Sequence, residues 1–457
     1  MPRGLPRFTR WAAPPVRQNR QLVEEFWLSL DLDVKHTPDR RYRYYVLFIL
    51  MIGQTLSVID RGLISVVMTN IQHDFQLNDT QLGLLGGTAF ALFYATFGIP
   101  IARLADRANR KNIFAAAVTI WSLATAACGA AGGFVSLFLA RMGVGIGEAG
   151  GTPPSHSLLS DYFSKVELGR AIGFLSMGGA LGVLGGHLIG TALVEAYGWR
   201  MVFFITGFPG VILGLLTYLT VREPERGRLL EPGLRGRTQA PLGETIRSLL
   251  GNKVYVGIVA GHTFALVTVQ ALLIWLYPLI ERNFAMPKTE IGAYAAAVLL
   301  FCAMPSLFIG GVISDHMAKR NLKWMSWLPA IFVAASIPFY YLMLGAESPL
   351  IFFIYLGAFN IFINLETAPV FASVQAHSAP SERALAVALL AFCVTIVGYA
   401  ITPVVVGTLS DTVFASLGER SLHAGLALIG LCALISIWCF HYAAKHTETV
   451  TPQPQER

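Results

Sequence analysis

The sequence predicts an all-α membrane protein with twelve transmembrane helices in two six-helix, pseudo-symmetric bundles. Of its 457 residues, 54% are hydrophobic and 13% are charged, whereas soluble domains carry about 25% charged residues. Twelve apolar stretches of about 20 residues follow one another, and each is long enough to cross a bilayer. A loop motif recurs about 210 residues further along the chain, which indicates a duplicated half.

The predicted spans form two sets with a polar segment between them. The first set covers residues 44–69, 80–103, 112–131, 134–160, 169–194 and 200–221. The second set covers residues 253–279, 291–313, 324–344, 350–374, 384–408 and 422–443. The segment between them is rich in Arg, Gly and Pro. We therefore expect one bundle over 44–221, a linker over 222–252, a second bundle over 253–443 and a tail over 444–457.

The N-terminal arm, residues 1–43, allows two interpretations. Its segment from Arg17 to Leu30 places apolar side chains on one helical face, which favours a helix lying on the membrane surface. A disordered arm is the alternative. The apolar residues on that face are Leu22, Val23, Phe26, Trp27 and Leu30.

The distribution of Lys and Arg predicts the orientation of the chain. With the N-terminus inside, the predicted inner loops hold seventeen basic residues and the outer loops hold four. Cytoplasmic loops carry an excess of Lys and Arg. We therefore expect an integral protein of the plasma (inner) membrane with both termini in the cytoplasm. The net charge of +7 then reflects topology and does not indicate a nucleic-acid partner.

No part of the sequence predicts catalysis or a bound cofactor. All five cysteines fall in apolar stretches, without the spacing of metal ligands. No spacing of a nucleophile and a base, and no G-K-[ST] phosphate loop, occurs in the chain. We expect a monomer that is neither an enzyme nor driven by ATP.

The recurring loop motif places bases at fixed distances after an acid. In GIPIARLADRANRK, Asp106 precedes Arg110 and Lys111 by four and five residues. In SLFIGGVISDHMAKR, Asp315 precedes two bases at the same distances. An acid at a helix start is favoured by the helix dipole, and the bases can pair with it or face lipid phosphates. We interpret these loops as an inner gate that consists of Asp106, Arg107, Arg110, Lys111 and Asp315.

Four charged residues lie inside predicted membrane helices. Asp60 and Arg61 fall in the first helix, and Arg141 and Glu148 in the fourth. A charge at the bilayer centre costs about 2.5–3.5 kcal/mol on insertion scales, so these residues should have a use. Arg141 and Glu148 share one helix face, since seven residues make nearly two turns. The helical rise puts Asp60 and Arg61 near the depth of Arg141, which predicts an Asp60–Arg141 pair and leaves the deeper Glu148 less clearly partnered.

Three roles are open for these charges. Asp60 and Glu148 could bind protons, because burial disfavours a charged carboxylate and a nearby Arg favours it. An Arg that changes partner between conformations would then couple protonation to transport. The alternatives are a static ion-pair lock between helices and direct binding of a substrate anion by Arg61 or Arg141.

The second half carries neutral residues at the corresponding positions. Gln270 corresponds to Asp60 and Asn360 to Glu148. Glu366 is an exception that could titrate or gate the inner end. We expect His187 and His262 to be packing residues more readily than proton relays. The candidate polar residues of a central cavity in this half are Gln270, Asn360, Asn364 and Glu366.

The repeated loop and the six-plus-six helices resemble the major facilitator superfamily. Ala102, Asn109 and His316 depart from the family's loop pattern, G-x-x-x-D-[RK]-x-G-[RK]-[RK]. The Asp-Arg of helix 1 and ARMGVGIGEAGGTPP of helix 4, followed by Asp161-Tyr162-Phe163, resemble the Spinster branch. The resemblance implies that helices 1, 4, 7 and 10 line a cavity that opens alternately to either side. Animal members of that branch export sphingosine 1-phosphate or lysolipids.

These observations together predict a proton-coupled secondary active transporter that works by alternating access. Its substrate would be a lipid-like or amphipathic organic anion, since the aromatic residues of helices 7 and 10 suit an amphiphile. Protons and membrane lipids are the other expected partners. The alternatives are a small organic-anion/proton symporter and, from another class, a transporter-like ligand sensor.

Overall fold

The computed structural model describes residues 39–105, 107–226, 242–321, 323–379 and 382–447. Asp106 and the surface helix expected in the N-terminal arm lie outside these residues. The chain divides into two compact units, Met1–Val46 and Leu47–Arg457. Within the first unit, Arg40 lies over the ring of Tyr44 at 5.9 Å. The second unit holds the helical bundle described below.

The first six crossing segments follow the predicted spans closely. Helix 1 is α2, helix 3 is α5, and helices 2 and 4 are each built from shorter pieces. Helices 5 and 6 meet at Gly198, whose φ of 77° breaks α9 into two parts. The elements are α2 (Arg40–Phe75), α3 (Asp79–Gly83), η1 (Leu84–Thr88), α4 (Ala89–Ala105), α5 (Arg110–Gly129), α6 (Phe134–Glu148), α7 (Thr152–Tyr162), α8 (Lys165–Gly185), η2 (Gly186–Gly190) and α9 (Thr191–Thr220).

The second six segments follow a short helix, α10 (Leu242–Gly251), which lies within the expected linker. Helix 7 is α11 and helix 9 is α14, while the other four are built from shorter pieces. The elements are α11 (Lys253–Phe284), α12 (Lys288–Val298), η4 (Leu299–Ala303), α13 (Met304–Ala318), α14 (Trp324–Leu344), α15 (Pro349–Leu365), α16 (Thr367–Ala376), α17 (Arg383–Cys393), η5 (Val394–Ile401), α18 (Thr402–Asp411), η6 (Ala415–Arg420), α19 (Ser421–Ile429) and α20 (Cys432–His446).

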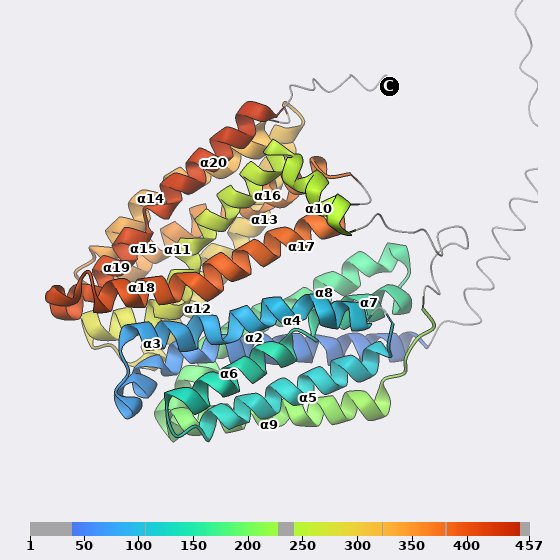
Figure 1. The fold of residues 1–457 in the computed structure, drawn as a ribbon, viewed down its shortest axis with the longest axis horizontal. Helices are drawn as coiled ribbons and strands as arrows, with labels where there is room; N and C mark the ends of the chain where they lie inside the picture. Colours follow the sequence, from blue (N-terminus) through green and yellow to red (C-terminus); the bar gives the residue numbers. More distant parts are fainter. Residues whose placement is uncertain (1–38, 106, 227–241, 322, 380–381, 448–457) are drawn as a thin grey trace, which may run out of the picture. The chain divides into compact units, whose positions relative to one another are not determined.

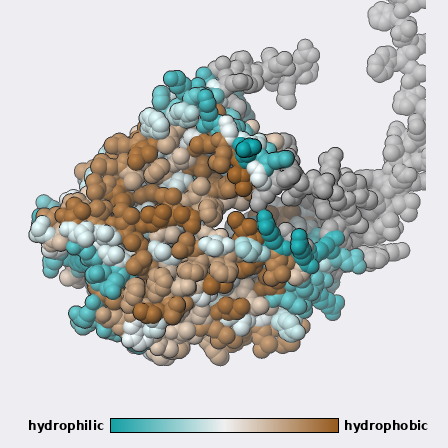
Figure 2. Space-filling model, viewed as in Figure 1, coloured by the Kyte–Doolittle hydropathy of each residue, from teal (hydrophilic) through white to brown (hydrophobic). Residues whose placement is uncertain are grey.

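The predicted fold class is confirmed. Among the described residues, ten helical segments are long and apolar enough to cross a membrane. One of these, Val166–Thr220, holds two helices because of the break at Gly198. Helix 4 is a further crossing that is interrupted between α6 and α7. In Figure 2, apolar side chains cover the middle of the visible face and hydrophilic residues gather at its ends, as expected for a protein in a bilayer.

Glycines bring helix 5 into contact with helix 1. Gly178, Gly182, Gly186 and Gly190 recur every four residues and therefore share one face of helix 5. A Cβ at Gly178 would lie 2.5 Å from the Met51 carbonyl oxygen. The equivalent Cβ atoms on the other three would meet residues at the same spacing on helix 1. These are Thr55 and Val58, then Ile59, then Leu63. The four-residue spacing of the glycines thus gives a close contact between the two helices.

One π-helical turn interrupts each of helices 2, 5, 8 and 11. These helices meet across the two halves, since η1 and α4 pack against η5, while η2 packs against α12. At one crossing, the Thr88 hydroxyl donates to the Ala400 carbonyl over 2.5 Å. The same irregularity therefore occurs at matching places in both halves, which agrees with a duplicated six-helix unit.

A polar cluster joins the two halves at the end of the bundle where α3 packs against α18 and the last turns of α11 reach them, at the left of Figure 1. We call this the Asp79 end. Arg282 donates two hydrogen bonds to the Asp79 carboxylate, at 2.6 and 2.8 Å. Ser410 also donates to Asp79, at 2.7 Å. Asp411 accepts from the backbone N–H and the hydroxyl of Thr80, both at 2.7 Å, and so caps α3.

We predict that Arg282→Gln opens the Asp79 end. Asp79 keeps its hydrogen bond from Ser410 but loses two charge-assisted bonds, each worth about 1.5–3 kcal/mol. The population that is open at this end should rise by about tenfold or more. Distances between spin labels at Gln76→Cys and Glu419→Cys, measured by double electron–electron resonance, report this population.

Arg420→Gln is the matched control, because Arg420 is an exposed arginine at the same end. Equal distance distributions for Arg282→Gln and Arg420→Gln would show that the Asp79–Arg282 pair does not hold the halves together.

Candidate functional site

Small residues on helix 4 allow the charged residues to lie in the core of the first half. A Cβ at Gly147 would lie 2.6 Å from the backbone nitrogen of Trp121 on helix 3. A Cβ at Gly145 would collide with the carbonyl oxygen of Phe90 on helix 2. Only glycine therefore permits these two approaches. They place Arg141 and Glu148, on either side of the glycines, among helices 1, 2 and 3.

Glu148 forms an ion pair with Arg61 of helix 1. The Arg61 Nε donates to Glu148 Oε2 over 2.6 Å, and Ser57 donates to the same oxygen over 2.6 Å. The side chain of Glu148 is fully buried, whereas Arg61 keeps 25% of its side-chain surface accessible. The expectation that Glu148 lacks a clear partner is therefore wrong. Ser57 and Arg61 are four residues apart and so present one helix face to it.

Asp60 points toward helix 3. Its Oδ2 accepts a hydrogen bond from the Thr125 hydroxyl over 2.7 Å. Its other oxygen, Oδ1, is buried and has no hydrogen-bond partner among the described residues. The expected Asp60–Arg141 ion pair does not form within the described part of the chain, although Arg141 attracts Asp60 electrostatically. Adjacent helical residues are about 100° apart, so Asp60 cannot face helix 4 together with Arg61.

Arg141 is a fully buried guanidinium with unfilled hydrogen-bonding capacity. Only 1% of its surface is exposed, and its Nε and Nη1 have no partner in the described parts of the chain. The ring of Phe90 lies 5.4 Å from its Cζ and 5.0 Å from the Cζ of Arg61. Tyr94 lies 4.7 Å from the Arg61 Cζ. The π face of Phe90 therefore contacts both cations, and the π face of Tyr94 contacts Arg61.

The predicted polar residues of the second half do not converge on one point. Gln270 is buried, and its side chain packs against Gly398 of helix 11. Asn360 donates to the Leu356 carbonyl over 2.9 Å, and Asn364 donates to the Asn360 carbonyl over 2.8 Å. Both amides are thus bonded to the backbone of their own helix.

Glu366 has a partner that sequence comparison of the halves did not reveal. His262 of helix 7 lies 2.8 Å from Glu366, between Nδ1 and Oε1. Both side chains are buried, at 4% and 0% exposure. His262 thus has a buried hydrogen-bond partner in addition to its packing contacts. The signal available in the sequence was a lone histidine and a lone acid on two helices expected to line the cavity.

The expected inner-gate residues divide into a bonded group and an exposed group. Arg110 is buried and binds Asp161 at 2.5 Å and Glu223 at 2.7 Å. Arg110 therefore bonds to helix 4 and to the segment after helix 6, while Asp106, the acid of its own loop, lies outside the described residues. The Lys111 ammonium donates to the Tyr218 carbonyl over 3.0 Å. The exposed residues are Arg107 and Asp315.

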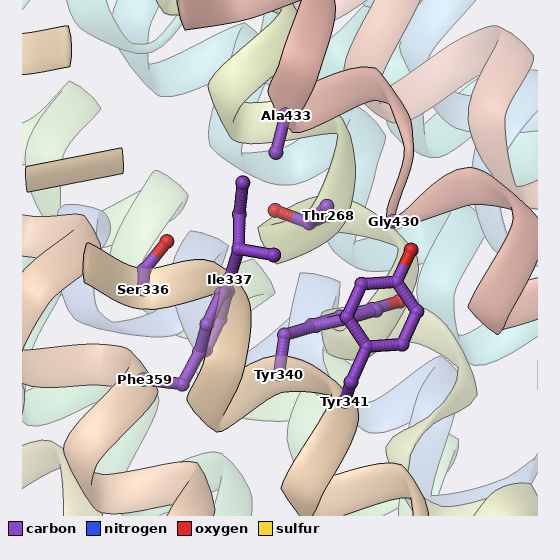
Figure 3. Close-up of a pocket in the computed structure, with 8 residues that line it drawn as sticks. All are labelled: Thr268, Ser336, Ile337, Tyr340, Tyr341, Phe359, Gly430 and Ala433. Atoms are coloured by element: carbon purple, nitrogen blue, oxygen red, sulfur yellow. The ribbon is translucent and has the colours of Figure 1, made fainter. Parts of the chain in front are cut away.

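A separate small pocket lies within the second half, between α11, α14, α15 and the α19–α20 junction (Figure 3). Its interior leaves no room for a water molecule. Its hydroxyls are already used, since Tyr340 and Tyr341 donate to the carbonyls of Leu426 and Ala427. It therefore offers no anchor for a charged substrate. The lining residues are Thr268, Ser336, Ile337, Tyr340, Tyr341, Phe359, Gly430 and Ala433.

Comparison with solved structures identifies close matches to this arrangement of helices. A bacterial homolog of the human lysosomal transporter Spinster, in an inward-facing and unoccupied conformation, has a TM-score of 0.81 at 29% identity. The match covers 89% of this chain and 98% of that one. The same kind of homolog in an inward-facing and occupied conformation matches with a TM-score of 0.79 at 28% identity, over 91% and 100% of the two chains.

Curated relatives are transporters of several kinds. An MFS-type efflux pump of Mycolicibacterium smegmatis is 28% identical over 91% of this chain and 96% of its own. Protein spinster homolog 1 of Xenopus tropicalis is 27% identical over 82% of this chain and 74% of its own. A probable L-galactonate transporter of Escherichia coli is 27% identical over 63% of this chain and 65% of its own.

The family model described as Major Facilitator Superfamily matches residues 50–403. This range runs from the first transmembrane helix into the eleventh, and so includes the Arg61–Glu148 pair and both gate loops. This family and the relatives named above are transporters and not enzymes. The chain is a membrane transporter of the Major Facilitator Superfamily, with Spinster-like proteins among its relatives.

Proposed function

We propose that this chain is a proton-coupled transporter of an amphipathic organic anion. The observation that carries the proposal is the buried group of two acids and two arginines in helices 1 and 4, which we call the charge cluster. It consists of Asp60, Arg61, Arg141 and Glu148. Such residues inside a membrane protein mark ion or substrate pathways. Several of their polar atoms lack partners among the described residues, which suits a site that changes partners.

Charge balance explains how the charge cluster would couple protons to an anion. With both acids ionised the cluster is neutral, because arginine stays protonated. A proton on Glu148 would weaken its bond to Arg61 and leave that guanidinium without a counter-ion. A substrate anion could then take the place of the carboxylate. Proton binding at Glu148 and anion binding at Arg61 would therefore favour each other.

The surroundings of Arg61 support an anion that also carries an apolar part. Arg61 is the most accessible member of the charge cluster, and it lies against the rings of Phe90 and Tyr94. A cation among aromatic rings suits an acidic headgroup followed by a hydrophobic chain. The resemblance of helices 1 and 4 to the Spinster branch implies the same class of substrate.

A small organic anion is the second candidate substrate. The E. coli relative described as a probable L-galactonate transporter favours it, since a sugar acid would need the same guanidinium. A ligand sensor with this fold would bind either anion without moving it.

We propose the plasma membrane as the location, with both termini and the Arg110 end in the cytoplasm. The positive-inside rule supports this orientation. The supporting residues are the bases of the loops at that end, among them Arg107, Arg110, Lys111, Lys319 and Arg320.

We predict that Glu148→Gln or Asp60→Asn abolishes the contribution of the charge cluster to the pH dependence of transport. Each amide keeps the size of the side chain but cannot bind or release a proton. Counterflow in liposomes at a series of pH values would measure the effect. Glu347→Gln is the matched control, since Glu347 is an exposed acid outside the helices. A pH dependence that is unchanged in both cluster variants would refute the proton site.

We further predict that Arg61 and Glu148 are energetically coupled. Arg61→Gln leaves a buried carboxylate with Ser57 as its remaining bonded partner, which should cost roughly 3 kcal/mol or more of unfolding free energy. The double variant Arg61→Gln/Glu148→Gln should recover most of this loss, because no uncompensated charge remains. Unfolding in detergent, analysed as a double-mutant cycle, tests this. Additive losses would mean that the two residues act independently.

The substrate class can be tested with one panel. Counterflow of radiolabelled lysolipids, compared with galactonate and other sugar acids, should favour the lysolipids and should fail in Arg61→Gln. Preference for sugar acids would establish the second candidate. Binding without counterflow by any member of the panel would indicate a sensor.

A further inference from the structure

A second buried acid–base pair lies in the other half of the protein. Glu366 sits between α15 and α16 of helix 10, and His262 lies on helix 7. The Nδ1–Oε1 distance is 2.8 Å. The second carboxylate oxygen of Glu366, Oε2, is also buried and has no partner within the described ranges. Neither side chain belongs to the charge cluster proposed for transport.

The hydrogen-bond ladder of helix 10 has a break beside this acid, although the φ of −73° and ψ of −23° at Glu366 remain helical. Glu366 is the single residue that separates α15 from α16. Pro369 follows three residues later and has no N–H to donate to the Leu365 carbonyl. Gly310 of helix 8 lies against that carbonyl, since a Cβ there would be 2.6 Å from its oxygen. The acid therefore lies beside this break, and a neighbouring helix packs closely against the same break.

Glu366 lies on helix 10, and the titratable groups named below on the neighbouring helices 8, 9 and 11 provide no second charge for it. Helix 8 carries Asp315 and His316 at its exposed end. On helix 9, the hydroxyls of Tyr340 and Tyr341 donate to backbone carbonyls. On helix 11, the Arg383 Nε donates to the Gln375 carbonyl, and Cys393 is a half-buried residue at the end of α17.

His262 lies on helix 7, and the polar groups near it likewise bond to or pack against other residues. The ring of Phe371 stands edge-on to the imidazole, with 6.1 Å between centroids. The Tyr255 hydroxyl donates to the Ala386 carbonyl over 2.9 Å. On helix 12, His441 packs against Trp327 and the Ser436 hydroxyl donates to the Gly261 carbonyl. The remaining titratable groups on that helix are His423, Cys432, Cys439, Tyr442, Lys445 and His446.

Each half therefore bonds an acid on its fourth helix to a base on its first helix. In the first half the acid is Glu148 and the base is Arg61. In the second half the acid is Glu366 and the base is His262. The chemistry of the two bases differs, since arginine keeps its proton at all accessible pH values while histidine exchanges it near neutrality.

We propose that His262 and Glu366 form a second proton-binding site, which holds one proton while it is buried between helices 7 and 10. The pair is neutral overall only with one proton, whether this sits on the carboxyl or on the imidazole. Removing it leaves a buried carboxylate, and adding another leaves a buried imidazolium. Either isolated charge is costly in an apolar interior. Water that reaches the break in helix 10 on a conformational change would release the proton.

The role of this site in coupling rests on the proposed proton-coupled transport. Proton binding by His262 and Glu366 does not depend on that proposal. Infrared difference spectra of the reconstituted protein between high and low pH test the proton directly. We expect a band of a protonated carboxylic acid, or of imidazolium, that is lost in both Glu366→Gln and His262→Gln. Glu347→Gln is the matched control and should keep the band. A spectrum that is unchanged in Glu366→Gln would overturn the proposal.

A second measurement separates this site from the charge cluster and from a purely structural role. Spin labels at Val166→Cys and Lys319→Cys report the opening of the Arg110 end as a function of pH. The double variant His262→Gln/Glu366→Gln keeps a polar contact, and we expect it to lower the pH dependence by about one proton per protein. An unchanged profile in this variant would overturn the proposal. A change there, with unchanged profiles in Asp60→Asn and Glu148→Gln, would support this site and refute the charge cluster.

Discussion

The cost of placing a charge in an apolar interior governs the central part of this structure. Glu148 is fully buried, and Arg61 and Ser57 donate to one of its two oxygens. A carboxylate without these donors would lose several kcal/mol to desolvation. The positions of helices 1 and 4 therefore depend on keeping this pair together. The ion pair would also respond to protonation, because a proton on Glu148 removes the negative charge that attracts Arg61.

Glycine makes this electrostatic arrangement possible. Helix 4 carries Gly145 and Gly147 between its two charged residues, and each lies against the backbone of a neighbouring helix. Close approach brings Phe90 over two guanidinium groups, which compensates in part for the hydrogen bonds that Arg141 lacks among the described residues. Packing by small residues, which drives helix association in membranes, here positions charges that larger side chains would keep apart.

The two halves use the same geometry for different chemistry. Both pair an acid on the fourth helix with a base on the first, and both carry π-helical turns where helices 2 and 5 meet helices 11 and 8. One half has a base with a permanent charge, while the other has a histidine. The Asp79 end holds the halves together through Arg282 and Asp411. This agrees with the similarity to inward-facing Spinster homologs.

The sequence by itself determined the number, order and approximate limits of the helices. Apolar length and loop charge depend on local composition, and the glycine spacing on helix 5 indicates a close helix contact without saying which helix is the partner. The presence of costly charges also marked Asp60, Arg61, Arg141 and Glu148. Only the tertiary structure decided which of them meet, because adjacent residues on a helix point about 100° apart. The His262–Glu366 pair likewise depends on how helices 7 and 10 pack, and no spacing along the chain encodes a contact between residues so far apart in sequence.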